Sequence, residues 1–239
     1  MSDSKVLCPT AHNNLRITTR YGSDFGDNVQ FVPTYPLEFR NIQSCYPIFF
    51  TKSAESGEFY PIALFGFEPG ENLYLDGLGW DASYIPLMIK RQPFMIGYQN
   101  DDKENKNPVV MIDIKSPKIS KKDGEALFDE NDQPSEFLQK IMGQLEALDK
   151  AHQHNKGFIE ALIKYDLIEP FTLEVKLNNG STNQLKGFYT INEDKLALLK
   201  GDALADLNKN SFLQAIYMSI ASYSRIKPLI EKKNILSSN

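Results

Sequence analysis

The hydrophobic pattern of the chain changes near its middle, and this change constrains the fold more than any other sequence feature. The first 115 residues hold short runs of aromatic and β-branched side chains separated by Gly, Pro and Asp, which is the pattern of short strands. After residue 135 the apolar residues recur at three- and four-residue spacing, as they do in helices. We therefore predict an α+β fold, with a β-rich N-terminal half of about six short strands and a C-terminal half of helices around a β-hairpin.

Two of the predicted strands contain a proline. Pro47 and Pro61 lack the N–H that a β-ladder requires, so their strands are expected to begin there or to lie at a sheet edge. The six predicted strands are Leu15–Thr19, Tyr46–Phe50, Phe59–Phe67, Asn72–Leu75, Phe94–Tyr98 and Val109–Ile114.

An amphipathic helix is predicted at the start of the C-terminal half. Ser135 is expected to cap it, and its apolar positions run from Phe137 to Leu148. Gly157 is expected to end or kink this helix before a second apolar stripe.

A β-hairpin is predicted after the helical segment. Thr172–Leu177 alternates polar and apolar residues, Asn178–Ser181 has turn composition, and Leu185–Ile191 returns as a second strand.

Helices are predicted again after the hairpin. Asn192 is expected to cap the first of them, and Gly201 to end it. Ser211 opens a capping-box pattern before a long apolar face, and Pro228 is expected to end or kink that helix.

The whole chain, residues 1–239, is predicted to be a single unit with compositional parts. These are a β-rich part at 10–115, a charged loop or boundary at 100–135, and a helix-hairpin-helix part at 135–235. The charged segment has few residues whose burial would offset the entropy of ordering it.

Composition excludes several classes of function. The net charge is −5 and no block is strongly basic, so we expect no nucleic-acid partner. The apolar runs are far shorter than the roughly 20 residues of a membrane helix, so we expect no membrane insertion. Two widely separated cysteines and no signal-peptide pattern indicate a cytoplasmic protein. The formation of a homo-oligomer stays an open alternative.

Motifs for metal, cofactor or nucleophilic chemistry are weak, and we predict no catalytic residue, metal or cofactor. His152 and His154 are two residues apart, so on a helix they point in different directions and are expected to be solvated. The sequence has no G-x-S-x-G elbow, although a Cys–His or Ser–His pair assembled in space stays open.

The segment from Gly66 to Asp81 concentrates acidic and aromatic residues. One interpretation is a hairpin with acidic turns in which the tryptophan is a core anchor. The other is a surface where rigid aromatics frame polar groups that recognise a partner. A calcium site is a weaker alternative, because the carboxylate spacing matches no EF-hand loop. The predicted partner-binding residues are Glu68, Glu71, Asn72, Tyr74, Asp76, Trp80, Asp81, Tyr84 and Arg91.

Basic residues near this segment and at the C-terminus have two interpretations each. Arg91 is expected to clamp a carboxylate, either of a ligand or of an internal partner such as Asp81. The C-terminal basic residues form either an anion patch or a complement to a helix dipole. They are Arg225, Lys227, Lys232 and Lys233.

Several separate blocks resemble the SapC family of bacterial proteins over roughly residues 10 to 234. The blocks are Tyr46–Phe50, Pro61–Phe67, Gly70–Asp76, Trp80–Pro86, Arg91–Phe94, Leu167–Phe171, Gly187–Glu193 and Ala215–Ser224. The resemblance carries no established catalytic residues to this chain.

What the resemblance implies about function is an accessory role. The family takes its name from a surface-layer protein locus, and some members are labelled transport components, which does not suit a chain without a membrane-length segment. Family members are often encoded beside halogenase-like and cupin- or JmjC-like proteins, which implies a peptide- or protein-modifying system. We therefore predict a cytoplasmic, non-enzymatic accessory protein that recognises a peptide or protein partner.

Two alternatives to this prediction stay open. The first is an enzyme that uses Glu71, Asp76 or Asp81 as general acid or base, provided that the surroundings tune their pKa. The second, which follows from the family name alone, is support of surface-layer assembly or secretion.

Overall fold

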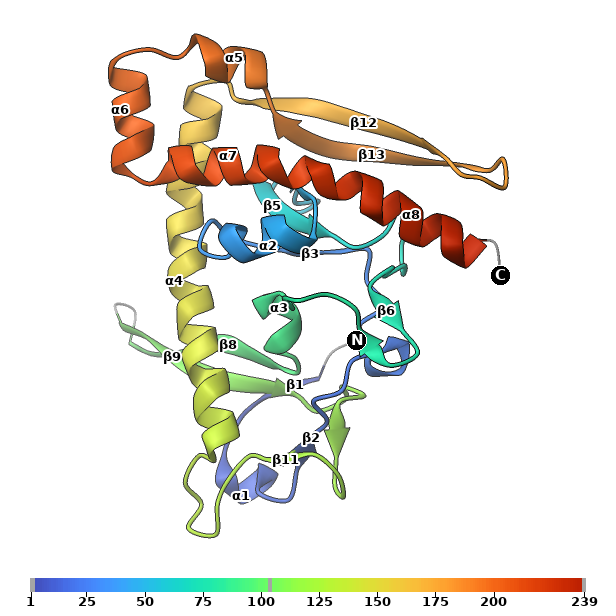
Figure 1. Cartoon of the computed structure of the whole chain (residues 1–239). Coiled ribbons are helices and arrows are strands. Elements are labelled where there is room, and N and C mark those ends of the chain that lie inside the picture. The colour runs from blue at the N-terminus through green and yellow to red at the C-terminus, as the bar shows by residue number, and fades with distance from the viewer. Residues whose placement is uncertain (1–2, 103–104, 238–239) are drawn as a thin grey trace. The chain divides into compact units, whose positions relative to one another are not determined.

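The chain has an α+β fold in the computed structural model, which describes residues 3–102 and 105–237 (Figure 1). Contacts divide it into two compact units. Unit 1 consists of Met1–Asp27, Gly77–Trp80 and Leu87–Lys150. Unit 2 consists of Asn28–Asp76, Asp81–Pro86 and Ala151–Asn239.

Unit 2 is built on an antiparallel five-stranded sheet in the order β12-β13-β4-β5-β3. Its two long strands form the predicted hairpin, and β13 joins the hairpin to the shorter strands. The strands are β3 (Phe31–Pro33), β4 (Ile48–Lys52), β5 (Phe59–Leu64), β12 (Ile168–Lys176) and β13 (Thr182–Ile191).

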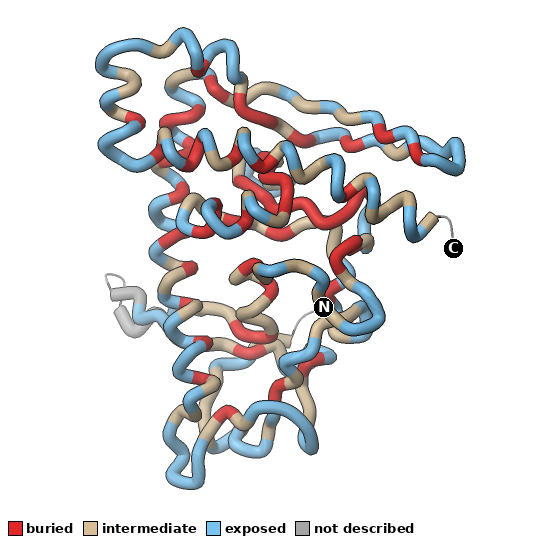
Figure 2. The backbone as a smooth tube through the Cα atoms, viewed as in Figure 1, coloured by how far each residue is buried: buried red, intermediate tan, exposed pale blue. Residues whose placement is uncertain are grey.

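The central strands of this sheet are covered on both faces. Residues 46–50 and 61–67 are buried without interruption, as Figure 2 shows. The ring of Phe50 lies 6.3 Å from that of Phe158, whereas the ring of Phe49, on the opposite face, stacks on Phe171 at 4.8 Å and on Tyr223 at 5.5 Å. Strands buried on both faces are continuously apolar, which explains the unbroken aromatic runs of the sequence.

Helices follow the hairpin, and the last two of them run beside it (Figure 1). Ser222, at the end of α7, accepts a hydrogen bond of 2.8 Å from the backbone N–H of Ile48 and so joins the helical layer to β4. The other elements of unit 2 are α2 (Phe39–Cys45), β6 (Leu75–Asp76), α5 (Glu193–Leu198), α6 (Asp202–Lys209), α7 (Phe212–Ser222), the 3-10 helix η2 (Tyr223–Arg225) and α8 (Ile226–Ser237).

Unit 1 has two small antiparallel sheets, ordered β1-β9-β8 and β10-β2-β11. Helix α4 (Glu136–Lys164) begins in unit 1, and its residues from Ala151 onward belong to unit 2. The remaining elements of unit 1 are β1 (Ser4–Val6), α1 (Pro9–His12), β2 (Arg16–Ile17), η1 (Ser23–Phe25), β7 (Gly79–Trp80), α3 (Leu87–Lys90), β8 (Phe94–Asp102), β9 (Asn105–Asp113), β10 (Ile119–Ser120) and β11 (Glu125–Ala126).

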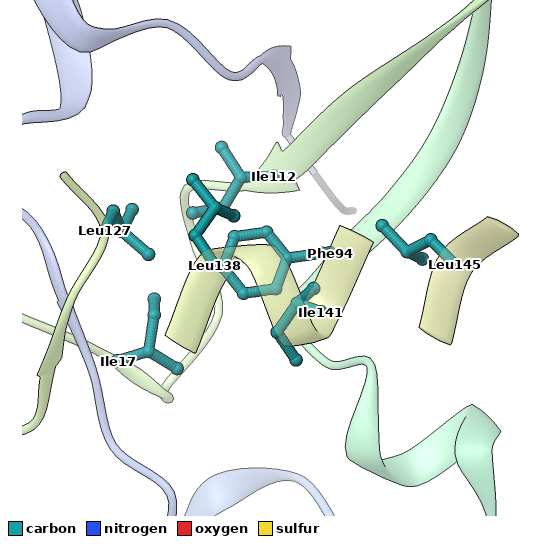
Figure 3. Close-up of a cluster of buried hydrophobic side chains, with 7 residues drawn as sticks. All are labelled: Ile17, Phe94, Ile112, Leu127, Leu138, Ile141 and Leu145. Carbon is teal, nitrogen blue, oxygen red and sulfur yellow. The ribbon is translucent and has the colours of Figure 1, made fainter. Parts of the chain in front are cut away.

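The core of unit 1 joins the start of α4 to both small sheets (Figure 3). Spacings of three and four residues place the α4 members on one side of the helix. The buried cluster consists of Ile17, Phe94, Ile112, Leu127, Leu138, Ile141 and Leu145.

A buried ion pair also stabilises unit 1. Lys118 Nζ lies 3.0 Å from Asp27 Oδ2, and the two side chains are 3% and 0% exposed. The ammonium group also donates to the carbonyl of Arg20 at 3.3 Å and lies 4.8 Å from the centroid of the Tyr21 ring. These contacts offset the desolvation of both charges.

The structure confirms several predicted elements. Ser135 Oγ accepts from the N–H of Leu138 at 3.2 Å, as a helix cap does, and α4 begins at Glu136. Asn192 Oδ1 accepts from the N–H of Lys195 at 2.8 Å and caps α5. The hairpin has the predicted turn, since Leu177 donates to the carbonyl of Ser181.

Three predicted element boundaries are wrong, and one predicted cap, at Ser211 directly before α7, is absent. Gly157 does not end α4, which continues to Lys164. Gly201 lies beyond the end of α5 and adopts a left-handed φ of +55° immediately before α6. Ser211 also has a left-handed φ, of +60°, and makes no capping bond, so a tight turn replaces the expected capping box. Pro228 lies in the first turn of α8, where a missing N–H is tolerated.

Pro61 also differs from expectation, because it lies inside β5, which is flanked by β4 and β3. Its carbonyl accepts from the N–H of Thr34, the residue after β3. The donor that proline lacks therefore falls at the end of the ladder, where its loss disturbs no further pairing.

The charged segment 100–135 contains the end of β8, the whole of β9 and the two short strands β10 and β11. Residues 103–104 of that segment lie outside the described residues. The boundary assigned to this segment stays a prediction.

Removal of Lys118 is expected to destabilise unit 1 strongly. Lys118→Met leaves the buried carboxylate of Asp27 without its ion-pair partner, which lowers the free energy of unfolding by about 3–5 kcal/mol. Urea titration followed by the fluorescence of Trp80, whose ring contacts Tyr21, measures this change. Lys121→Met, at an exposed position, is the control, and similar unfolding midpoints for the two variants would contradict the prediction.

Candidate functional site

A cavity of about 840 Å³ opens in unit 2 between the β4–β5 turn and α4. The end of β3 and the start of β5 form one wall, and α4 forms the facing wall. The cavity is lined by Pro33, Tyr35, Ser53, Ala54, Glu55, Ser56, Gly57, Glu58, Phe59, Tyr60, His152, Asn155, Lys156, Ile159, Glu160 and Ile163.

The lining combines aromatic, apolar and polar groups. The ring of Tyr35 meets that of His152 edge to face at 6.0 Å. Burial raises the pKa of Tyr60, so this phenol stays neutral near neutral pH. Ile163 is 56% exposed although it is a large apolar residue. A concave surface with aromatic walls and a few polar groups is the usual form of a ligand site.

Asn155 is the buried polar residue of the cavity wall. It is 7% exposed, and within the described part of the chain its Oδ1 atom is buried and accepts no hydrogen bond. An unsatisfied buried acceptor costs about 1–3 kcal/mol. Such a group is uncommon in a folded protein and calls for a donor.

The charged groups of the cavity are mostly acidic. Glu55 and Glu58 lie on the β4–β5 turn, and Glu160 lies on α4 with Lys156. All four are exposed, and no ion pair joins them to another group of the described chain.

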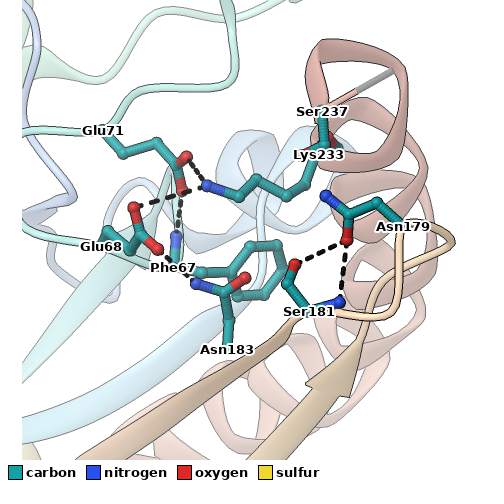
Figure 4. Close-up of polar contacts among 8 residues, drawn as sticks. All are labelled: Phe67, Glu68, Glu71, Asn179, Ser181, Asn183, Lys233 and Ser237. Atoms are coloured by element: carbon teal, nitrogen blue, oxygen red, sulfur yellow. Dashed lines mark hydrogen bonds and ion pairs between the residues drawn. The ribbon is translucent and has the colours of Figure 1, made fainter.

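The predicted residues Glu68 and Glu71 come together on Lys233 of α8 (Figure 4). Glu71 pairs directly with the ammonium group and also accepts from the N–H of Phe67 at 2.7 Å. Glu68 lies 3.5 Å from the same ammonium group and accepts from the amide of Asn183 at 2.5 Å. The two carboxylates thus join their loop to α8 and to the hairpin.

This cluster shifts the pKa of Lys233 upward. Burial by itself lowers the pKa of the ammonium group, but the hydrogen bonds and charges of Glu71 and Glu68 outweigh that effect. The carboxylates are therefore partners of a charged lysine at neutral pH.

Asn72, Tyr74 and Asp81 also have partners within unit 2. Asn72 Oδ1 accepts from the N–H of Tyr74 at 3.0 Å, and the Tyr74 hydroxyl donates to the carbonyl of Cys45 at 2.8 Å. Burial raises the pKa of Tyr74. Asp81 pairs with Lys232, whose ammonium group lies 5.2 Å from the centroid of the Tyr74 ring.

Tyr84 and Asp76 complete the predicted residues of unit 2. The Tyr84 hydroxyl donates to Glu38 at 2.8 Å, and burial followed by the Glu38 charge raises the pKa of Tyr84. Asp76 is exposed. Glu71, Asp76 and Asp81 do not line the cavity described above, so that cavity does not bring together the carboxylates of the predicted acid–base alternative.

Trp80 and Arg91 belong to unit 1. Trp80 is half-buried, and its ring meets that of Tyr21 edge to face at 5.8 Å. Arg91 donates to the carbonyl of Phe94 at 2.5 Å. The partner-binding role of Trp80 and Arg91 stays a prediction.

The histidines and cysteines give no strong site. His152 and His154 are exposed, as expected. Cys8 Sγ lies 3.9 Å from His12 Nδ1, and the same nitrogen accepts from the Cys8 N–H at 3.2 Å. Among the described residues, no group of three His, Cys, Asp or Glu side chains could hold a metal ion.

Sequence reasoning missed the cavity entirely. Its walls come from the β4–β5 turn and from α4, about a hundred residues apart along the chain. The only signals were Ile159 and Ile163, two apolar residues at helical spacing after Gly157.

A SapC family model matches residues 7–229 of the chain. No curated protein and no solved structure matches it. Within the described residues, every helix is too short or too polar to cross a membrane.

The neighbouring lysines of α8 are expected to differ in their effect on stability. Lys233 and Glu71 are 13% and 18% exposed, so Lys233→Met lowers the free energy of unfolding by about 2 kcal/mol because it leaves a largely buried carboxylate without its ion-pair partner. Lys232→Met removes a pair in which Asp81 is 58% exposed and lowers it by only about 0.5 kcal/mol. Urea unfolding followed by circular dichroism measures both, and equal losses would contradict the prediction.

Proposed function

The chain belongs to the SapC family, and from that premise we propose that it is an accessory binding protein that recognises a peptide or protein partner through the cavity of unit 2. The observation that carries the proposal is the cavity itself, which has a volume of about 840 Å³ and aromatic walls. Its size is that of a small-ligand or peptide subsite. A cytoplasmic location stays a prediction from the sequence.

The β5 edge beside the cavity favours an extended peptide as the ligand. The carbonyl of Pro61 points toward β3, because it accepts from the N–H of Thr34 at 3.0 Å. Backbone groups alternate in direction along a strand, so those of Phe59, two residues earlier, point the same way but beyond the end of β3 at Pro33. Since Phe59 lines the cavity, a peptide bound there can pair with this edge, as in β-augmentation.

The internal ion pairs of the acidic segment also favour the cavity as the binding site. Glu68, Glu71 and Asp81 already pair with lysines of α8, so a partner would have to displace those lysines before it used the carboxylates. The charged groups at the cavity carry no such internal pairing within the described chain.

A substitution at the exposed apolar rim is expected to weaken peptide binding. Ile163→Asp removes apolar surface from the cavity and should raise the Kd of peptides selected from a random display library by about tenfold. Leu198→Asp, at an apolar residue of α5 that is 74% exposed and outside the cavity, should leave the Kd unchanged. Interferometry on the full chain gives both values. Selected peptides that bind the Ile163→Asp variant with wild-type affinity, or a failure to select any peptide, would overturn the proposal.

The partner-binding role predicted for Trp80 and Arg91 has its own test on the same peptides. If these residues form the partner surface, Trp80→Ala combined with Arg91→Ala should raise the Kd about tenfold or more and keep a cooperative thermal transition. If recognition occurs at the cavity alone, the double variant should bind as the wild type does. An unfolded double variant would instead assign the segment a structural role.

A further inference from the structure

The cavity of unit 2 has an uneven charge that the proposed function does not use. Three carboxylates, on Glu55, Glu58 and Glu160, line it against the one ammonium group of Lys156. All are exposed, and no ion pair joins any of them to another group of the described chain. The lining thus carries two more negative than positive charges, which favours a cation over an anion as the ligand.

A second observation points to a ligand that donates hydrogen bonds. Asn155 lines the cavity, and its buried Oδ1 atom accepts no hydrogen bond from the described chain. The oxygen becomes available to a bound group when rotation of the amide about its Cβ–Cγ bond turns it toward the cavity. An ammonium or guanidinium group has only donors and meets this requirement.

The aromatic residues of the wall suit the same ligand. The rings of Tyr35, Phe59 and Tyr60 line the cavity, and aromatic rings attract cations and pack against an aliphatic stem. Lys52 demonstrates the attraction, because its ammonium group lies 4.7 Å from the centroid of the Phe59 ring. Lys52 does not line the cavity, so the rings of Tyr35 and Tyr60 are the ones we assign to a ligand.

We propose that the cavity takes a basic side chain, lysine or arginine, from a peptide whose neighbouring residues are apolar. The proposal rests on the proposed function and deepens it. The stem of the basic residue packs against Tyr35 and Tyr60, its head lies between Glu58 and Glu160 and donates to Asn155, and the apolar neighbours cover Ile159 and Ile163.

Three blocked tripeptides of equal size test the charge preference. They are N-acetyl, C-amide forms of Leu-Arg-Leu, Leu-Gln-Leu and Leu-Glu-Leu, titrated into the isotope-labelled full chain while the amide signals of the cavity residues are followed by NMR. The arginine peptide should bind about tenfold more tightly than the glutamate peptide at low salt. Raising the salt concentration should narrow this ratio, because exposed charges are screened.

Charge removal at the cavity provides the matched comparison. Glu58→Gln combined with Glu160→Gln should reduce the ratio between the arginine and glutamate peptides to about threefold or less. Glu174→Gln combined with Glu231→Gln removes the same charge from exposed positions outside the cavity and should leave the ratio near its wild-type value.

The outcomes separate this inference from the proposed function. Equal binding of all three peptides at the cavity, or preference for the glutamate peptide, would overturn the charge preference and leave peptide binding intact. If the peptides shift only signals outside the cavity, or shift no signals at all, both the charge preference and the cavity as a peptide site are wrong.

Discussion

Unit 2 depends on the burial of β4 on both of its faces. Phe49 and Phe50 point to opposite sides of the sheet, so each needs its own apolar layer. Phe158 of α4 packs against Phe50, whereas Phe171 of β12 and Tyr223 of η2 pack against Phe49. Removal of either layer would expose aromatic surface, which is why a sheet with short strands requires both the hairpin and the helices around it.

The same requirement creates the cavity. The residues of α4 that face the core, such as Phe158 and Leu162, hold the helix against the sheet. Residues at helical spacing on the adjoining face, including Asn155, Ile159 and Ile163, lie opposite the β4–β5 turn, which extends past the end of β3. Because α4 packs through one face and the β4–β5 turn extends beyond β3, the space between the helix and the turn is left unfilled and forms the cavity.

Local patterns in the sequence sufficed for elements whose causes are local. The caps at Ser135 and Asn192 and the hairpin turn after Leu177 depend on residues within a few positions of one another, and all three were predictable. The predictions at Gly157 and Ser211 were wrong because the surrounding structure, and not the local sequence, determines the backbone there. Packing of α4 stabilises the helix despite the low helix propensity of Gly157. The turn before α7 gives Ser211 a left-handed backbone, and its side chain makes no capping bond.

Composition marks candidate site residues in the sequence, but it does not reveal the partners of their side chains. The sequence marks Glu68, Glu71 and Asp81 as acidic residues in a glycine-rich segment, yet the lysines that pair with them lie about 150 residues further along the chain. Only the folded chain reveals that these carboxylates are internal partners. The basic residues Lys232 and Lys233 were likewise assigned to an anion patch or a helix dipole, whereas both form ion pairs with that segment.

The carboxylates of residues 68–81 form ion pairs with lysines of α8, whereas the carboxylates of the cavity form none within the described chain. This difference bears on where a partner would gain binding free energy. A partner of the acidic segment must first break pairs such as the one between Glu71 and Lys233, and the lost pair subtracts from the binding free energy. A cation at Glu58 and Glu160 meets no internal competitor in the described chain, and it also satisfies the buried oxygen of Asn155. Local acidity alone would place recognition at residues 68–81, but under the proposed function a cation reaches the carboxylates of the cavity without displacing a lysine of the described chain.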